Sequence, residues 1–255
     1  MSIIKNEIPI LEFDSERSAV IDPDHEKLSM ALPEKALFAF LGALTEEYAI
    51  KNGGKKVGEF ESATKRFPIY IINHKGEDIC LCQAPVGSAP AAQLMDWLIG
   101  YGAKKIISTG CCGALRQMPE NMFLIPTRAL RDEGTSYHYL PPSRYVDLSP
   151  IAAEAIKKAL TDQEIEYREV TTWTTDGFYR ETPEKVSYRR NEGCDVVEME
   201  CAALAACAKF RGALWGCMLF TGDTLANIHA HDPRNWGADS HSTALALCLD
   251  ALLYL

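Results

Sequence analysis

Two spacings of hydrophobic residues alternate along the chain and predict an α/β fold. Short runs rich in Ile, Val, Tyr and Cys indicate strands, and longer segments with apolar residues three and four apart indicate helices. The first thirty or so residues are polar and rich in acidic positions. We therefore expect an irregular arm over residues 1–30 and one domain over residues 31–255. The expected helices are Pro33–Leu44, Ala91–Tyr101, Ile151–Leu160, Ala202–Phe210 and Thr243–Leu255.

Several of the expected strands end in small or acidic residues. The expected strands are Pro68–Asn73 and Asp78–Gln83, which form a hairpin, followed by Lys105–Thr109, Tyr167–Thr172, Val196–Glu198 and Ala213–Phe220. Lys105–Thr109 runs into the sequence Gly110-Cys111-Cys112-Gly113, and Ala213–Phe220 is expected to stop at Thr221-Gly222-Asp223. Ligands of α/β folds bind where strands end. We therefore expect Gly110–Gly113, Glu198/Glu200 and Asp223 to converge on one pocket.

Composition and charge narrow the class of protein. The chain of 255 residues has a formal charge of -9, which argues against a nucleic acid or an anionic membrane as its main partner. A small anionic ligand is still compatible with that charge. No apolar run reaches membrane-spanning length, and the N-terminus lacks the pattern of a secretory signal. The nine cysteines are mostly within apolar runs and lack zinc-site spacing, so we expect reduced thiols, no metal and a cytoplasmic location.

Three segments carry residues suited to chemistry, each with a structural alternative. The glycines of Gly110–Gly113 let backbone N–H groups approach a ligand, or they serve only a tight turn. Glu198 and Glu200 precede an Ala-rich helix, where a buried carboxylate needs a partner such as sugar hydroxyls. Alternatively, one of them caps that helix, and for Glu198 this alternative stays open. Asp223 could remain protonated and act as a general acid, or it could be a turn residue.

Five segments in order resemble the uridine and purine nucleoside phosphorylase family. They are Ile107–Ala114, Arg131–Tyr139, Thr174–Tyr179, Val197–Glu200 and Thr221–Asp223, and the resemblance extends from about Pro33 to the C-terminus. It implies a single α/β domain with a mixed, partly barrel-like central sheet flanked by helices. It also implies a homo-oligomer, a dimer or a hexamer, with active sites near subunit interfaces.

The resemblance also implies roles for individual residues. Glu200, with Glu198 beside it, would bind the ribose hydroxyls, and Met199 would pack under the sugar. Phe178 would stack on the base, and Gly110 and Cys111 would line the substrate site. Asp223 would protonate a purine at N7.

The base preference depends on the residues after Phe178-Tyr179. Uridine-specific relatives use a Gln and an Arg there, whereas this chain continues Arg180-Glu181-Thr182-Pro183, so the preference leans to purine. The segment Asp132–His138 is closer to the uridine branch, which keeps uridine as an alternative.

The phosphate site departs from the family pattern. The family loop Gly-Asp-Pro-x-Arg corresponds to Ala31-Leu32-Pro33-Glu34-Lys35, and a second phosphate Arg corresponds to Ser108. The resemblance assigns phosphate to Lys35, Ser108, the backbone near Ser88 and, from a neighbouring subunit, Arg66. Lys binds phosphate as a point charge without the bidentate geometry of Arg.

The resulting hypothesis is a phosphorylase that forms free base and ribose 1-phosphate, with inorganic phosphate as co-substrate and no cofactor. One alternative is a hydrolytic nucleosidase, although Glu34 is a poor match for its water-activating carboxylate. Another is a nucleoside-binding protein with weak activity.

The segment around His229-Ala-His231 has two interpretations. Together with Asp232 and His241 it could hold a metal ion. Its Asn, Asp and Pro content favours a loop that covers the Asp223 site, from which Arg234 could reach Asp223.

Overall fold

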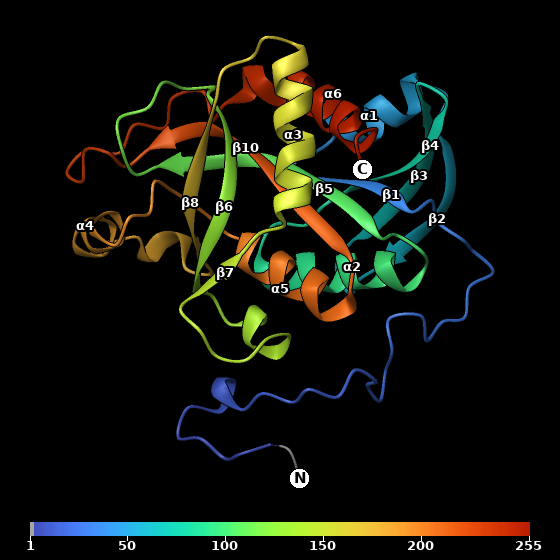
Figure 1. The fold of residues 1–255 in the computed structure, drawn as a ribbon, viewed down its shortest axis with the longest axis horizontal. Coiled ribbons are helices and arrows are strands. Elements are labelled where there is room, and N and C mark those ends of the chain that lie inside the picture. The colour runs from blue at the N-terminus through green and yellow to red at the C-terminus, as the bar shows by residue number, and fades with distance from the viewer. Residues whose placement is uncertain (1–2) are drawn as a thin grey trace.

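The computed structural model describes residues 3–255, and its strands form one continuous sheet that curls into a barrel (Figure 1). The strands are β1 Lys35–Ala39, β2 Lys55–Glu61, β3 Arg66–His74, β4 Glu77–Gln83, β5 Lys105–Ala114, β6 Phe123–Asp132, β7 Tyr145–Asp147, β8 Tyr167–Thr175, β9 Val196–Glu198 and β10 Leu214–Thr224. Their order is β10-β6-β8-β9-β5-β1-β4-β3-β2, and β10 also pairs with β5. The ring β5-β10-β6-β8-β9 is therefore closed, which confirms the expected mixed, partly barrel-like sheet.

β5 joins the barrel to the rest of the sheet. Its first half pairs in parallel with β1, its last two residues pair with β9, and β10 runs along nearly its whole length. The expected turn at Gly110–Gly113 was wrong, because these residues continue the strand and pair with residues 219–221 and Val197. β10 likewise continues past Phe220 and includes Asp223.

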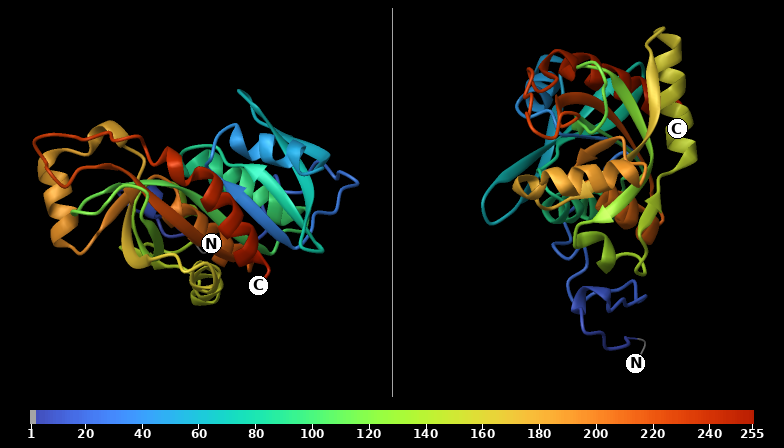
Figure 2. Two further views of the ribbon diagram at one scale, coloured as in Figure 1. Left: turned by 90° about the horizontal axis from the view of Figure 1, so that it is seen from above. Right: turned by 90° about the vertical axis from the view of Figure 1, so that its left-hand side faces the viewer.

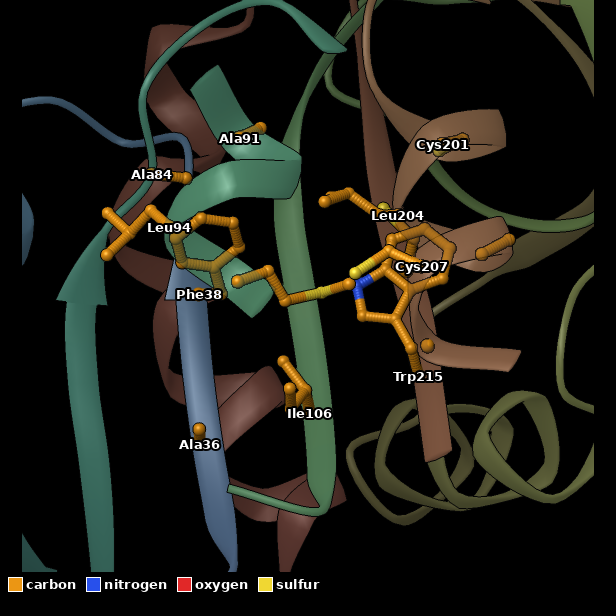
Figure 3. Close-up of a cluster of buried hydrophobic side chains, with 14 of the residues drawn as sticks. Ala36, Phe38, Ala84, Ala91, Leu94, Ile106, Cys201, Leu204, Cys207 and Trp215 are labelled. Atoms are coloured by element: carbon orange, nitrogen blue, oxygen red, sulfur yellow. The ribbon is translucent and has the colours of Figure 1, made fainter. Parts of the chain in front are cut away.

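Helices cover both faces of the sheet (Figure 2). They are α1 Leu44–Lys51, α2 Ser88–Gly100, α3 Pro150–Asp162, α4 Pro183–Asn191, α5 Cys201–Arg211 and α6 His241–Leu252. α2 and α5 enclose one buried cluster that includes Leu94, Leu204 and Trp215 (Figure 3). α1, α3 and α6 enclose a second cluster on the other face, which includes Ile156 and Leu249. Side chains of the barrel strands belong to both clusters, for example Leu219 to the first and Met218 to the second.

The helix expected over Pro33–Leu44 was wrong. β1 occupies the first part of this segment, and α1 begins only at Leu44. β1 lies between β4 and β5 with Ala36, Leu37, Phe38 and Ala39 all buried. A strand covered on both faces is apolar throughout and lacks alternation, so its short run resembles one turn of a buried helix. The other expected helices and strands are confirmed, whereas β2, β6, β7, α1 and α4 were not anticipated.

The N-terminal segment runs along the outside of the domain (blue in Figures 1 and 2). Between residues 3 and 34 its regular structure is one 3-10 turn, Pro9–Leu11. It is attached by few hydrogen bonds, such as that from Trp97 Nε1 to Glu26 at 3.0 Å, and Ile4, Val20 and Ile21 are exposed. Within residues 3–255, each helix is too short or too polar to cross a membrane.

Candidate active site

A cavity of about 330 Å³ opens where β5, β9 and β10 end. Its walls include Gly110–Gly113 of β5, Val197 and Glu198 of β9, and Asp223 of β10. Phe178 and Trp236 come from two loops that follow β8 and β10. The inner end is apolar and reaches Leu204 and Trp215 of the cluster under α5 (Figure 3). The three strand ends that the sequence pointed to thus meet at one site.

The glycines of β5 make room for neighbouring side chains. A Cβ at Gly110 would lie 2.9 Å from Cβ of Phe40. A Cβ at Gly113 would lie 3.0 Å from a methyl of Val197 and 3.1 Å from Oδ1 of Asp223. Real Cβ atoms do not approach so closely, so glycine at these positions allows Phe40 and Asp223 to line the cavity.

Glu198 is the helix cap. Its Oε2 accepts the backbone N–H groups of Glu200 at 2.7 Å and Cys201 at 2.6 Å, at the start of α5. Its Oε1 accepts the hydroxyls of Thr172 at 3.0 Å and Thr174 at 2.6 Å. Four protein donors therefore bind this buried carboxylate. Its contacts match the alternative in which Glu198 caps the start of the Ala-rich helix.

The Glu200 carboxyl group can still form hydrogen bonds with a ligand. It is 9% exposed and lines the cavity, and it accepts the backbone N–H of Gly87 just before α2. Burial and the neighbouring charge of Glu198 raise the pKa of Glu200 to about 8. The carboxyl group is therefore mostly protonated at neutral pH, and it can both donate to and accept from sugar hydroxyls.

Asp223 is paired with a histidine. Its Oδ2 lies 2.8 Å from Nε2 of His231, and the Asp223 side chain is 10% exposed whereas that of His231 is 47% exposed. A bridge between Thr224 and Asp232 folds the loop back and brings His231 alongside. The expected contact from Arg234 was wrong, because its guanidinium donates to the carbonyls of Met118 at 2.7 Å and Gly222 at 3.4 Å.

The remaining cavity residues surround these carboxyl groups. Phe178, Met199 and Cys111 all line the cavity, as the sequence suggested. Burial, with the charges of Asp223 and Glu200, raises the pKa of the Cys111 thiol to about 11, so it stays neutral. Sequence reasoning missed Glu181, which lines the cavity and whose pKa burial and the Asp223 charge raise to about 7.

Trp236 and Phe40 also line the cavity, and sequence reasoning missed both. Trp236 is 45% exposed within a polar loop, and a large aromatic residue in such a loop was the available signal. Phe40 was hidden by the expectation of a helix, since only a strand over Lys35–Ala39 carries it to the cavity.

The proposed phosphate residues are not gathered at the cavity. Lys35 lies at the start of β1, the end remote from the cavity, and pairs with Glu77. Arg66 is exposed and pairs with Glu59 and Glu61. Ser108 is buried and accepts Nε1–H of Trp215 at 2.9 Å. Ser88 does lie beside the site, where its hydroxyl donates to the Met199 carbonyl at 2.6 Å.

The cavity wall is acidic. Its acidic and basic side chains within residues 3–255 are the four carboxyl groups of Glu181, Glu198, Glu200 and Asp223, without a Lys or Arg. Across the same residues, no three His, Cys, Asp or Glu side chains gather in a way that could hold a metal ion, and His229, His231 and His241 form no such group. All nine cysteines, which lie in this part of the chain, are unpaired.

Several known proteins are similar to this chain in sequence and fold. A guanosine phosphorylase of Halorubrum lacusprofundi is 26% identical over 161 residues, which are 63% of this chain and 67% of that protein. The structure of an AMP nucleosidase from Bacteroides thetaiotaomicron superposes with a TM-score of 0.68 at 28% identity, covering 87% of this chain and 88% of that one. A purine nucleoside phosphorylase from Toxoplasma gondii in complex with immucillin-H superposes at 0.75 with 20% identity, covering 92% and 96%. The profile of the phosphorylase superfamily matches residues 38–253, and the chain belongs to this superfamily.

Proposed function

We propose that this protein cleaves the N-glycosidic bond of a purine nucleoside and releases the free base. One observation carries the proposal: Glu200 and Asp223 line the same cavity, and the Glu200 carboxyl group can still form hydrogen bonds with a ligand. The ribose hydroxyls would bind Glu200, Met199 would pack under the sugar, and the base would lie against Phe178. Asp223 would protonate the base as the C1′–N bond breaks, which is general acid catalysis.

Phosphate is the proposed nucleophile, and the products would then be the base and ribose 1-phosphate. The name of the guanosine phosphorylase supports this choice, as does the start of α2 beside the site, where helix N–H groups favour an anion. The acidic wall requires a cation from elsewhere. We propose that a second copy of the chain supplies it in a homo-oligomer, with the exposed Arg66 as the candidate.

Hydrolysis is the second candidate, because two observations favour it. The cavity wall formed by residues 3–255 holds four carboxyl groups and no Lys or Arg, so this wall offers no positive charge to bind a phosphate dianion. The AMP nucleosidase, at 28% identity, is named for a nucleosidase activity. In this case water would attack C1′, and the products would be base and ribose.

Release of free base from a panel of nucleosides tests these proposals. The panel is inosine, adenosine, guanosine, uridine, methylthioadenosine and AMP, each with and without inorganic phosphate. Phosphate-dependent release from purines supports phosphorolysis, and equal release without phosphate supports hydrolysis. Release from uridine alone would contradict the purine preference. Binding without release would instead favour a nucleoside-binding protein.

A further inference from the structure

The loop that follows β10 places a histidine behind the proposed acid. His231 Nε2 lies 2.8 Å from Asp223 Oδ2. None of the hydrogen bonds within residues 3–255 uses the other oxygen, Oδ1, which faces the glycine at position 113. One oxygen of Asp223 is thus engaged by protein, and the other is open to a ligand in the cavity.

The position of His231 is fixed by several contacts. The backbone N–H of Thr224 donates to the carbonyl of Asp232 at 3.0 Å, which sets the residue next to His231. The Trp236 ring packs against the imidazole with centroids 5.9 Å apart. Beyond it, the backbone N–H groups of Asn235 and Gly237 donate to Glu120 at 2.8 and 3.0 Å. A loop held at both ends keeps the imidazole against Asp223.

The imidazole also connects the cavity wall with solvent. Nearly half of the His231 side chain is exposed, whereas Asp223 is buried. Within the described chain, its Nδ1 takes part in no hydrogen bond, so water can reach it.

We propose that His231 is the positioning residue for Asp223 and the route by which that carboxyl group recovers its proton, an inference that rests on the proposed glycosidic cleavage. When Asp223 gives its proton to purine N7, the electrons of the C1′–N bond go to the base and a carboxylate is left. His231 Nε2–H stabilises this carboxylate. Nδ1 then takes a proton from solvent as Nε2 passes one to Oδ2 of Asp223. A turn of the carboxyl group presents that proton to the cavity, and the imidazole regains its Nε2–H form by exchanging protons with solvent, so that both groups return to their starting state.

A 7-methylated purine nucleoside separates this role from a structural one. Methylation at N7 gives the base a fixed positive charge, so it leaves without being protonated. The experiment compares kcat/KM for guanosine and 7-methylguanosine, and for adenosine and 7-methyladenosine. It uses the full-length wild type, His231→Ala, His231→Gln and Asp223→Asn, with His229→Ala as the matched control, because His229 is exposed on the same loop and is not part of the cavity wall.

We expect His231→Ala to lower kcat/KM about 10- to 100-fold for the unmethylated substrates and less than about 3-fold for the methylated ones. Asp223→Asn should show the same selectivity with a larger loss. His231→Gln should recover part of the loss, since an amide N–H can take the place of Nε2–H. His229→Ala should stay within about 2-fold on all substrates.

Two outcomes overturn the proposal, and they differ. Equal losses on methylated and unmethylated substrates, or no loss at all, would show that His231 does not serve proton transfer while leaving glycosidic cleavage intact. No base release by the wild type from any substrate would overturn the proposed function and this inference with it.

Discussion

Glu198 accepts the backbone N–H of Glu200 at 2.7 Å, so the first carboxylate of the Glu-Met-Glu segment holds the second in place. Glu198 is occupied by four protein donors, whereas Glu200 receives the Gly87 N–H and faces the cavity. Two residues of the same type, two positions apart, thus differ in what they do. One organises the start of α5, and the other is available to a ligand.

The first prediction contrasts these two glutamates. Glu198→Gln should lower the free energy of unfolding by about 2–4 kcal/mol. Both carboxylate oxygens of Glu198 accept hydrogen bonds, whereas the NH2 group of a glutamine can only donate. Glu200→Gln should instead raise it by roughly 3 kcal/mol at pH 7, because the wild-type carboxyl group must take up a proton on folding whereas the amide need not. Urea denaturation of both variants and the wild type measures this. Equal losses in the two variants would contradict the assignment.

The second prediction concerns pH. The pKa of Glu200 is about 8 in the folded chain against an ordinary value of 4.5, so the folded state holds this proton more tightly. The associated stability is fully present below about pH 4.5 and is lost as pH rises towards 8. Between pH 5 and 9 the wild type should therefore lose roughly 4 kcal/mol relative to Glu200→Gln.

Urea midpoints at closely spaced pH values measure that difference. The Glu200→Gln variant is its own control, because all other titrating groups are shared. If the two curves run parallel between pH 5 and 9, Glu200 does not titrate there.

Sequence patterns picked out two carboxyl groups that line the cavity, Glu200 and Asp223, but misread one strand of the fold. Glu200 and Asp223 could be found because carboxylates next to long apolar runs stand out. β1 was mistaken for a helix because a strand buried on both faces has no alternation. The phosphate role of Lys35 came from the resemblance to the family motif, and the structure places Lys35 at the end of β1 remote from the cavity.

Contacts that depend on how a loop folds could not be read from the sequence. Both His231 and Arg234 follow Asp223 within eleven residues, and Arg234 is the stronger charge. A single bridge between Thr224 and Asp232 decides that the histidine meets the aspartate. Glu181 is similar, because its approach to Asp223 depends on the turn after Phe178.

The third prediction tests the space above Gly113. In Gly113→Ala the new methyl would lie 3.1 Å from Asp223 Oδ1 and 2.9 Å from Leu225 Cδ1, so Asp223 must move. We expect base release to fall at least about 10-fold, with a stability loss of about 1–3 kcal/mol from crowding. Gly134→Ala is the control, because its nearest neighbour would be 3.9 Å away. Normal activity in Gly113→Ala would show that the position of Asp223 does not depend on this glycine.

The fourth prediction concerns Lys35. Its ammonium group pairs with Glu77 at the end of β1 opposite the cavity, so Lys35→Met should leave kcat and the KM for phosphate within about 2-fold of the wild type. Steady-state kinetics over a range of phosphate concentrations measures both. A rise in the KM for phosphate by an order of magnitude would restore Lys35 to the phosphate site.

The last prediction concerns Glu181, whose pKa burial and the Asp223 charge raise to about 7 while His231 and Lys185 oppose the shift. Below pH 7 it is neutral, and above pH 7 it adds a negative charge beside the leaving base. That charge stabilises the positive charge that builds up as the base is protonated. The wild-type kcat/KM for a purine nucleoside should therefore rise several-fold between pH 6 and 8.

The Glu181→Gln variant should lack this rise, since its amide does not titrate. Glu184→Gln serves as the control, because Glu184 is an exposed residue at the start of α4 and is not part of the cavity wall. Its profile should follow that of the wild type. The same rise in Glu181→Gln would assign the titration to another group and leave Glu181 as a lining residue without influence on the charge of the leaving base.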